Sequence, residues 1–401
     1  MMQKTVFCLI VAVLGLFLAA GCDDGTPDHG TFDADYVSVD EDAADDHLPD
    51  QTDQSDQSDL SDLSDDPVVD GVVADTVVDE DVIAPVDEDA VVPDDDAVVD
   101  TGFFPVGAVW YQDISQAPKD AESDTVIANL ASDGGWGNGD TFQIDFSIEV
   151  LFADGATLRR EFFPTDEFYS PDCDQALVPV PDGGVLEGEE GYRCLSDGDC
   201  HLIVVEYDER KLYEMWRADI QEDVFFGGCM AVWDLTRIYG PSGRGDQCTS
   251  ADAAGYPIAP LLFTADEVAT GSIDHAIRFI LPNARIRNGI YVHPATHSTN
   301  ATGGGAGTIP YGARLRLKSS FNVDSLPSEG AKVVARALQK YGMFLADGGQ
   351  ITLTARSDRT TTAKWDGLLD PHDLSSLSVT DFEMIDGGER IAYTGDCVRI
   401  P

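Results

Sequence analysis

The sequence predicts a mainly β domain of the β-sandwich or jelly-roll kind, with one or two short helices, over residues 101–401. Three observations support this. Beyond residue 101, short apolar, aromatic and β-branched runs alternate with Gly, Asp, Asn and Pro. Only two segments carry a helical pattern, and the chain lacks the strand-helix alternation of a parallel sheet. Before residue 101 the composition is that of a disordered acidic linker.

The strands are expected where apolar residues alternate or form short runs. These segments are residues 141–152, 202–207, 211–216, 276–281, 313–318, 350–355 and 390–393. Asp154-Gly155 is a strong hairpin signal between the first of them and the run that follows. Together the segments predict many short strands joined by tight turns.

Two helices are expected. Thr264 followed by Glu267 three residues later is typical of a capping box, and it opens a short helix that stops near Gly271. Residues 328–341 place their apolar side chains on one helical face and their basic side chains elsewhere. We expect this second helix to cover a sheet edge or the end of a barrel.

The amino terminus indicates export. Residues 5–20 form an apolar run of 16 residues behind Lys4, which suits a signal peptide better than a membrane-spanning helix. The run ends in Ala19-Ala20-Gly21-Cys22, which resembles the lipobox of bacterial lipoproteins. We therefore expect residues 1–21 to be removed and Cys22 to be lipidated, anchoring the protein to the outer membrane or cell surface. The alternative is an ordinary cleaved signal with an incidental Cys22.

Residues 22–100 read as a tether. Residues 23–100 contain 29 Asp and Glu but no Lys or Arg, and the net charge of the whole chain is -50. Such a segment cannot bury enough apolar surface to fold, and its charges extend it. Residues 101–401 are also anionic, which disfavours partners such as nucleic acid and bare anionic lipid. We expect a monomer that binds a neutral or cation-bridged ligand.

Six cysteines in the predicted domain indicate three disulfides in an exported protein. They are Cys173, Cys194, Cys200, Cys229, Cys248 and Cys397. Fifteen pairings are possible. Short spacing favours Cys194 with Cys200 and Cys229 with Cys248, which would leave Cys173 for Cys397. No C-x-x-C spacing indicates a metal, and no motif indicates a cofactor.

The densest group of ionisable residues lies between residues 197 and 219. A short turn at residues 208–212 would place Glu206 opposite Glu214 on the same face of two strands. Carboxylates this close have split pKa values, as the acid and nucleophile of a retaining glycosidase require. A slip of one residue would put them on opposite faces. The alternative is a solvent-facing pair neutralised by nearby Arg or Lys.

Histidines are few in the domain. His201, His275 and His297 lie in or beside strand-like segments, where a neutral imidazole often hydrogen-bonds to backbone. The sharpest catalytic hypothesis is that these three converge with Glu206 and Glu214 on one cleft. Among the tryptophans, which could stack on sugars, Trp136 in a Gly-rich segment is expected to be the most exposed.

The domain resembles a family of exported bacterial proteins to which no activity is attached. The resemblance rests on residues 199–216 (DCHLIVVEYDERKLYEMW), 249–282 (opening TSADAAGYPIAPLLFTADEV and including DHAIRF), 310–323, 337–349 and 381–388. These segments cover about half of the domain. Members of the family carry an acid at the position of Glu206 and a Glu at that of Glu214. The resemblance implies a single domain and supplies no substrate.

The function we expect is that of a cell-envelope lipoprotein whose β-sandwich domain binds or cleaves a polysaccharide or other extracytoplasmic glycan. A glycan-active enzyme requires Glu206 and Glu214 in a concave groove near His201 or His275. The alternative is a non-catalytic structural or interaction module of the cell surface, with a shallow surface and carboxylates already paired with Arg.

Overall fold

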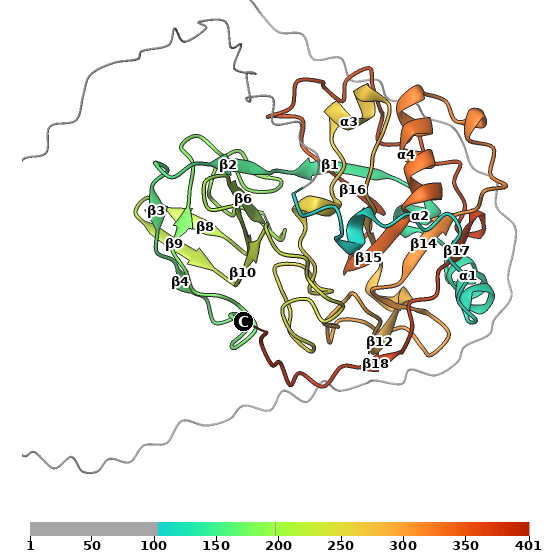
Figure 1. The fold of residues 1–401 in the computed structure, drawn as a ribbon, viewed down its shortest axis with the longest axis horizontal. Coiled ribbons are helices and arrows are strands. Elements are labelled where there is room, and N and C mark those ends of the chain that lie inside the picture. Colours follow the sequence, from blue (N-terminus) through green and yellow to red (C-terminus); the bar gives the residue numbers. More distant parts are fainter. Residues whose placement is uncertain (1–102, 197, 401) are drawn as a thin grey trace, which may run out of the picture. The chain divides into compact units, whose positions relative to one another are not determined.

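The computed structural model describes residues 103–196 and 198–400 (Figure 1). The predicted signal peptide, Cys22 and the acidic tether lie outside the described residues. The prediction of a mainly β domain with few short helices is confirmed. No helix in the part of the chain that the structure describes has the length and apolar character needed to cross a membrane.

The largest sheet has six strands in the order β1-β16-β11-β15-β14-β17. Its strands are β1 (Ile144–Ile148), β16 (Leu353–Arg356), β11 (Ile277–Leu281), β15 (Met343–Gly348), β14 (Arg314–Leu317) and β17 (Phe382–Met384). The central strands β11 and β15 run parallel, whereas β14 is antiparallel to both of its neighbours. Most side chains of β11 and β15 are buried.

A second sheet has four strands in the order β10-β7-β6-β2. Its strands are β10 (Cys229–Asp234), β7 (Lys211–Trp216), β6 (Leu202–Glu206) and β2 (Leu151–Ala153). Alternate residues of β6 face two different apolar cores: Ile203 and Val205 pack in the large one, Leu202 and Val204 in a smaller one. This sheet is therefore covered on both faces.

Three small sheets complete the fold. One contains β13 (Ile309–Tyr311), β12 (Ile286–Tyr291) and β18 (Ile391–Ala392). The others are β3 (Arg159–Arg160) with β5 (Val178–Pro179), and β4 (Phe163–Pro164) with β9 (Val224–Gly227) and β8 (Asp219–Gln221).

Parallel pairing is common although the chain lacks strand-helix alternation. β1 with β16, β2 with β6, β4 with β9, β11 with β15, and β12 with β13 are all parallel. Several of these pairs join segments far apart in sequence. Their connections pass through other sheets, so the parallel pairing leaves no regular pattern in the sequence.

Both predicted helices are confirmed. Helix α3 (Ala265–Thr270) begins with the capping box of Thr264 and Glu267 and ends at Gly271, whose φ is 90°. Helix α4 (Glu329–Lys340) begins at Ser328, whose hydroxyl accepts the Ala331 N–H, and packs on β14 (Figure 1).

The structure adds helices that the pattern does not predict. They are α1 (Ser123–Ser132), α2 (Gly137–Asp140) and the single turns η1 (Val109–Tyr111), η2 (Ala259–Leu261), η3 (Asn283–Arg285), η4 (Val323–Ser325) and η5 (Val379–Asp381). Helix α1 has only three buried large apolar residues and no side-chain cap, so its sequence signal is weak.

The hairpin expected at Asp154-Gly155 is wrong, although a turn is present. The Asp154 carboxylate accepts the Ala156 N–H and the Thr157 hydroxyl. The strands on either side pair elsewhere, β2 with β6 and β3 with β5. The side chain of Asp154 stabilises the turn, but β2 and β3 belong to two separate sheets and therefore do not pair with each other.

One of the three expected disulfides, Cys194–Cys200, is confirmed. The other two expected pairings are wrong, because the bonds are Cys173–Cys229 and Cys248–Cys397. The observed pairings differ from the expected ones because segments that are distant in sequence lie side by side in the fold.

Backbone contacts hold both of these bonds in place. The Asp174 N–H donates to the Met230 carbonyl, so the segment of Cys173 lies along β10. The Ile400 N–H donates to the Arg244 carbonyl, which brings the carboxyl end to the loop of Cys248. Neither contact can be predicted from the spacing of the cysteines in the sequence.

Trp136 is not the exposed aromatic residue that its Gly-rich surroundings predict. It is 0% exposed, packs edge-on against Phe142 and Phe382, and donates its indole N–H to the Leu377 carbonyl. The glycines around it let the backbone turn closely and do not expose the ring.

The buried face of α4 supplies a test of the fold. Replacing the fully buried Leu338 by Ala leaves a cavity, so we expect the free energy of unfolding to fall by about 2–5 kcal/mol. Arg336→Ala, at an exposed position of the same helix, should change it by less than about 0.5 kcal/mol. Urea unfolding of both variants measures this difference, and equal effects would contradict the placement of the helix.

Candidate functional site

A cavity of about 160 Å³ opens where the ends of β6, β7 and β15 meet the loop after Cys248. It is lined by Tyr169, Asp199, Trp216, Cys229, Thr249, Ser250, Ala251, Asp252, Ala253, His297, Thr299 and Asp347. Three of these residues are carboxylates, and no Lys or Arg is among them. We call it the aspartate pocket.

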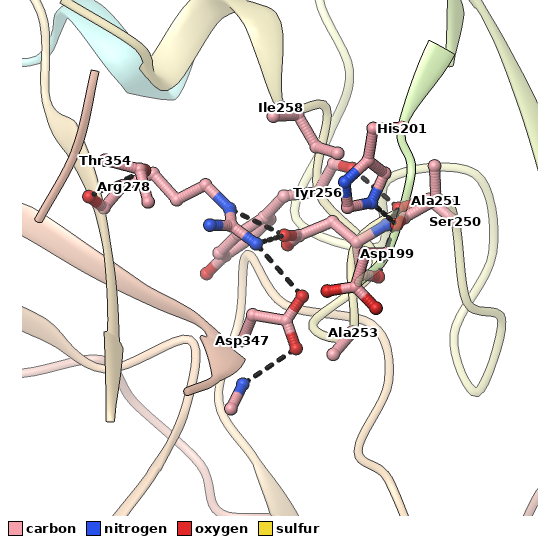
Figure 2. Close-up of polar contacts among 12 residues, drawn as sticks. Asp199, His201, Ser250, Ala251, Ala253, Tyr256, Ile258, Arg278, Asp347 and Thr354 are labelled. Carbon is pink, nitrogen blue, oxygen red and sulfur yellow. Dashed lines mark hydrogen bonds and ion pairs between the residues drawn. The ribbon is translucent and has the colours of Figure 1, made fainter. Parts of the chain in front are cut away.

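Behind the pocket, Arg278 joins two of its carboxylates (Figure 2). Its Nη2 lies 2.7 Å from Asp252 Oδ1 and 3.0 Å from Asp347 Oδ2, and its Nε donates to the same Asp252 oxygen at 2.8 Å. Arg278 lies on β11 and Asp347 on the neighbouring parallel strand β15. The strand pairing therefore brings one acid to the guanidinium, and a loop brings the other.

The loop that carries Asp252 is fastened at several points. Cys248 is bonded to Cys397, and the Thr249 N–H donates to Asp172 at 2.9 Å. The Ser250 hydroxyl donates to the Tyr256 carbonyl at 2.6 Å and accepts the Asp252 N–H at 3.0 Å. These contacts fix the backbone of the loop next to Asp252.

Asp252 is an unusual carboxyl group. The residue is 1% exposed, and its Oδ2 has no hydrogen-bond partner among the described residues. Burial raises the pKa of Asp252 to about 7, although the charge of Arg278 opposes this shift. Burial also raises the pKa of Asp347, and the nearby Asp199 adds to that effect, again against Arg278.

His201 supports the loop from the other side. Its Nδ1 lies 2.5 Å from Glu187 Oε2, and its Nε2 lies 2.9 Å from the Ala251 carbonyl. Burial alone would lower the pKa of His201, but the charge and hydrogen bond of Glu187 raise it to about 9. The imidazole is therefore protonated at neutral pH, and Glu187 balances its charge.

The rim of the pocket combines aromatic rings with an acid. The Trp216 indole N–H donates to Asp199 Oδ1 at 2.9 Å. Tyr169 lies beside Trp216, with ring centroids 6.5 Å apart, and is 48% exposed. Asp199 is exposed as well. The pocket thus passes from an aromatic rim to a carboxylate floor.

The predicted pairing of Glu206 with Glu214 is wrong. Strands β6 and β7 place Glu206 opposite Lys211 and Glu214 opposite Ile203. The turn is tighter than expected, and Arg210 takes a positive φ of 54° within it. This register puts the two glutamates on opposite faces of the sheet, so they form no catalytic pair.

Each of these glutamates has a structural partner. Glu214 is fully buried and accepts three hydrogen bonds, from the Ile258 and Ala259 N–H groups and from the Trp233 indole. Burial raises the pKa of Glu214 to about 7, although these hydrogen bonds act to lower it. Glu206 accepts the Glu209 N–H within the turn.

The expected convergence of the histidines is realised only in part. His297 lines the aspartate pocket; its Nδ1–H donates to the Ala253 carbonyl (2.7 Å), and its Nε2 lies 2.9 Å from the Tyr393 hydroxyl. His201 contacts the same loop at Ala251. His275 lies apart, beside Glu267 of α3 in a different cavity.

Sequence reasoning missed Asp252, Arg278 and Asp347. A signal was present, because Arg278 interrupts an apolar strand and Asp347 ends another, and charged residues are rarely buried without a partner. Asp252, Arg278 and Asp347 also fall within the segments that carry the family resemblance.

The described residues contain two groups of side chains with the spacing of metal ligands. One is Asp172 with Cys248 and Cys397, the other Glu189 with Cys194 and Cys200. In both, the cysteines are bonded to each other, so they are not available as thiolate ligands. The three acids of the aspartate pocket are not among these groups.

Comparisons with protein-family models, with curated proteins and with solved structures find no match for this chain.

The pair of His201 and Glu187 predicts a pH dependence. Because the pKa of His201 is raised above its ordinary 6.5 to about 9, its contribution to stability is complete below pH 6.5 and lost as the pH rises through 9. Urea unfolding should show that the free energy of unfolding of the protein exceeds that of its His201→Gln variant at pH 6, and that this difference becomes smaller as the pH rises to 9.5. The exposed His372→Gln serves as control, and a difference that stays constant would refute the ion pair.

Proposed function

We propose that the chain is a cell-envelope lipoprotein whose folded domain binds a sugar residue of an extracytoplasmic glycan in the aspartate pocket. The observation that carries this proposal is the combination of an aromatic rim, Tyr169 and Trp216, with a floor of carboxylates. Aromatic faces pack on the C–H groups of sugar rings, while carboxylates accept hydrogen bonds from their hydroxyls.

The size of the pocket supports a small ligand. Its volume of about 160 Å³ is below the roughly 300–1,000 Å³ of pockets that enclose drug-sized molecules. It would hold a single ring or its substituent, with the remainder of a longer glycan outside on the rim.

The envelope location is supported by separate features. The lipobox-like Ala19-Ala20-Gly21-Cys22 and the acidic segment after it suit an anchored protein whose domain reaches away from the membrane. Three disulfides in the described domain agree with an oxidising compartment outside the cytoplasm.

Cleavage is a second candidate, favoured by the environment of Asp252. Its raised pKa would keep a proton on this carboxyl group near neutral pH, and Asp347 lies beside it on the same guanidinium. Glycosidases use such a pair, one acid to protonate the leaving oxygen and one carboxylate to activate water or attack the sugar.

Binding is tested at the rim. Tyr169→Ala or Trp216→Ala should weaken binding to a glycan found on a glycan array by about 2- to 10-fold, the value of one aromatic contact. Tyr207→Ala is the matched control, since Tyr207 is 49% exposed but does not line the pocket. If no glycan binds, or if all three variants bind alike, the domain is an interaction module that acts without this pocket.

Cleavage is tested on the glycans that bind. If Asp252 is the general acid, incubation should release reducing ends, and Asp252→Asn should lower the rate at saturating glycan by at least about 100-fold. Glu214→Gln, which alters a buried carboxyl group outside the pocket, should retain the rate in whatever fraction of the protein stays folded. Absence of reducing ends with intact binding would leave binding as the function.

A further inference from the structure

We infer that the group that binds at the floor of the aspartate pocket is a protonated amine, so that the ligand is an amino-sugar residue with a free ammonium group. This inference rests on the proposed glycan function and adds the chemical class of the sugar. Three independent features of the pocket lead to it.

The first feature is the charge of the lining. Asp199, Asp252 and Asp347 all line the cavity, and within the described part of the chain the guanidinium that forms ion pairs with two of them, Arg278, lies behind the floor. The charge of His201 is already balanced by Glu187. A ligand with a positive charge would therefore complete the charge balance that Arg278 leaves unfinished.

The second feature is the vacant oxygen of Asp252. Arg278 binds Oδ1 twice, while Oδ2 is buried and accepts no hydrogen bond from the described residues. A buried acceptor without a donor destabilises the folded protein. An ammonium group has three N–H donors and no acceptor, so it can satisfy this oxygen without adding an unpaired acceptor. Its charge would also keep Asp252 ionised, against the burial that raises the pKa of this carboxyl group.

The third feature is the aromatic rim. Trp216 and Tyr169 stand at the entrance, and Trp216 is held by its hydrogen bond to Asp199. Ring faces attract an ammonium cation as well as the C–H groups of a sugar. Carboxylates beneath aromatic rings therefore favour an organic cation that has both a charge and an apolar surface.

A metal ion fits these features less well. The carboxylate oxygens of Asp199, Asp252 and Asp347 are not brought within 4.8 Å of one another as a ligand group among the described residues. Hard cations such as Ca²⁺ need six to eight oxygen ligands, and aromatic rings supply none.

The test compares two ligands that differ in charge. We expect the full-length protein to bind the glucosamine trimer at least about 10-fold more tightly than the N-acetylglucosamine trimer by calorimetry at pH 6.5, because acetylation removes the ammonium. One charge-assisted hydrogen bond accounts for a difference of this size. Calcium chloride alone is titrated in parallel.

Variants locate the binding. Asp252→Asn should weaken binding of the glucosamine trimer by about 10- to 100-fold more than it weakens binding of the acetylated trimer. Because Asp252 also holds Arg278, Asp199→Asn on the exposed rim is a second variant that should lower the same preference. Asp223→Asn, an exposed acid away from the pocket, makes the same change of charge as a control.

The outcomes separate this inference from the proposed function. If both trimers bind equally well and Trp216→Ala abolishes this binding, the preference for an ammonium group is wrong, while glycan binding in the pocket stands. If a simple amine such as cadaverine binds as tightly as the glucosamine trimer, amine recognition by the pocket stands, while the proposed glycan function is wrong. Binding of calcium alone, or an equal loss in Asp223→Asn, would overturn the inference.

Discussion

The buried guanidinium of Arg278 joins the large sheet to the loop after Cys248 by binding a carboxyl group from each. It lies on β11 and binds Asp347 on the neighbouring strand β15 as well as Asp252 in the loop after Cys248. Removing a single partner would leave a buried charge unpaired, which costs several kcal/mol (about 3–5) in comparable sites. The position of the Asp252 carboxyl group relative to the large sheet therefore depends on this cation, together with the backbone hydrogen bond from the Ala254 N–H to the Ala346 carbonyl.

Other contacts make the same loop rigid from outside the large sheet. The disulfide Cys248–Cys397 joins its beginning to the carboxyl end of the chain, and Glu214 of the second sheet accepts the N–H groups of Ile258 and Ala259 just after it. His201 holds the middle of the loop through the Ala251 carbonyl. A carboxyl group placed so firmly would change little in position when a ligand binds, which lowers the entropic cost of binding.

The sequence alone predicted the local features well. The capping box at Thr264, the amphipathic helix over residues 328–341 and the main strands are set by residues close together in the chain, and all are confirmed. The nearest disulfide, Cys194–Cys200, was predicted for the same reason. These features need only local propensity and periodicity.

Features that depend on distant contacts could not be predicted. The partner of Glu206 on β7 is Lys211, three positions before the expected Glu214, and this odd shift places the two glutamates on opposite faces. No rule of turn chemistry distinguishes the two registers when both strands are apolar on both sides. The aspartate pocket is assembled from seven separated segments, so Asp252 and Asp347 become neighbours only through the pairing of β11 with β15 and the folding of the loop.

The most direct measurement is a crystal structure of the protein with the glucosamine trimer. We predict that the ammonium nitrogen lies within hydrogen-bond distance of Asp252 Oδ2, that the sugar ring packs against Trp216, and that the contacts of Arg278 are unchanged. A trimer bound elsewhere on the molecule, or a pocket in which Asp252 Oδ2 is satisfied by a rearranged side chain of the protein itself, would contradict the account.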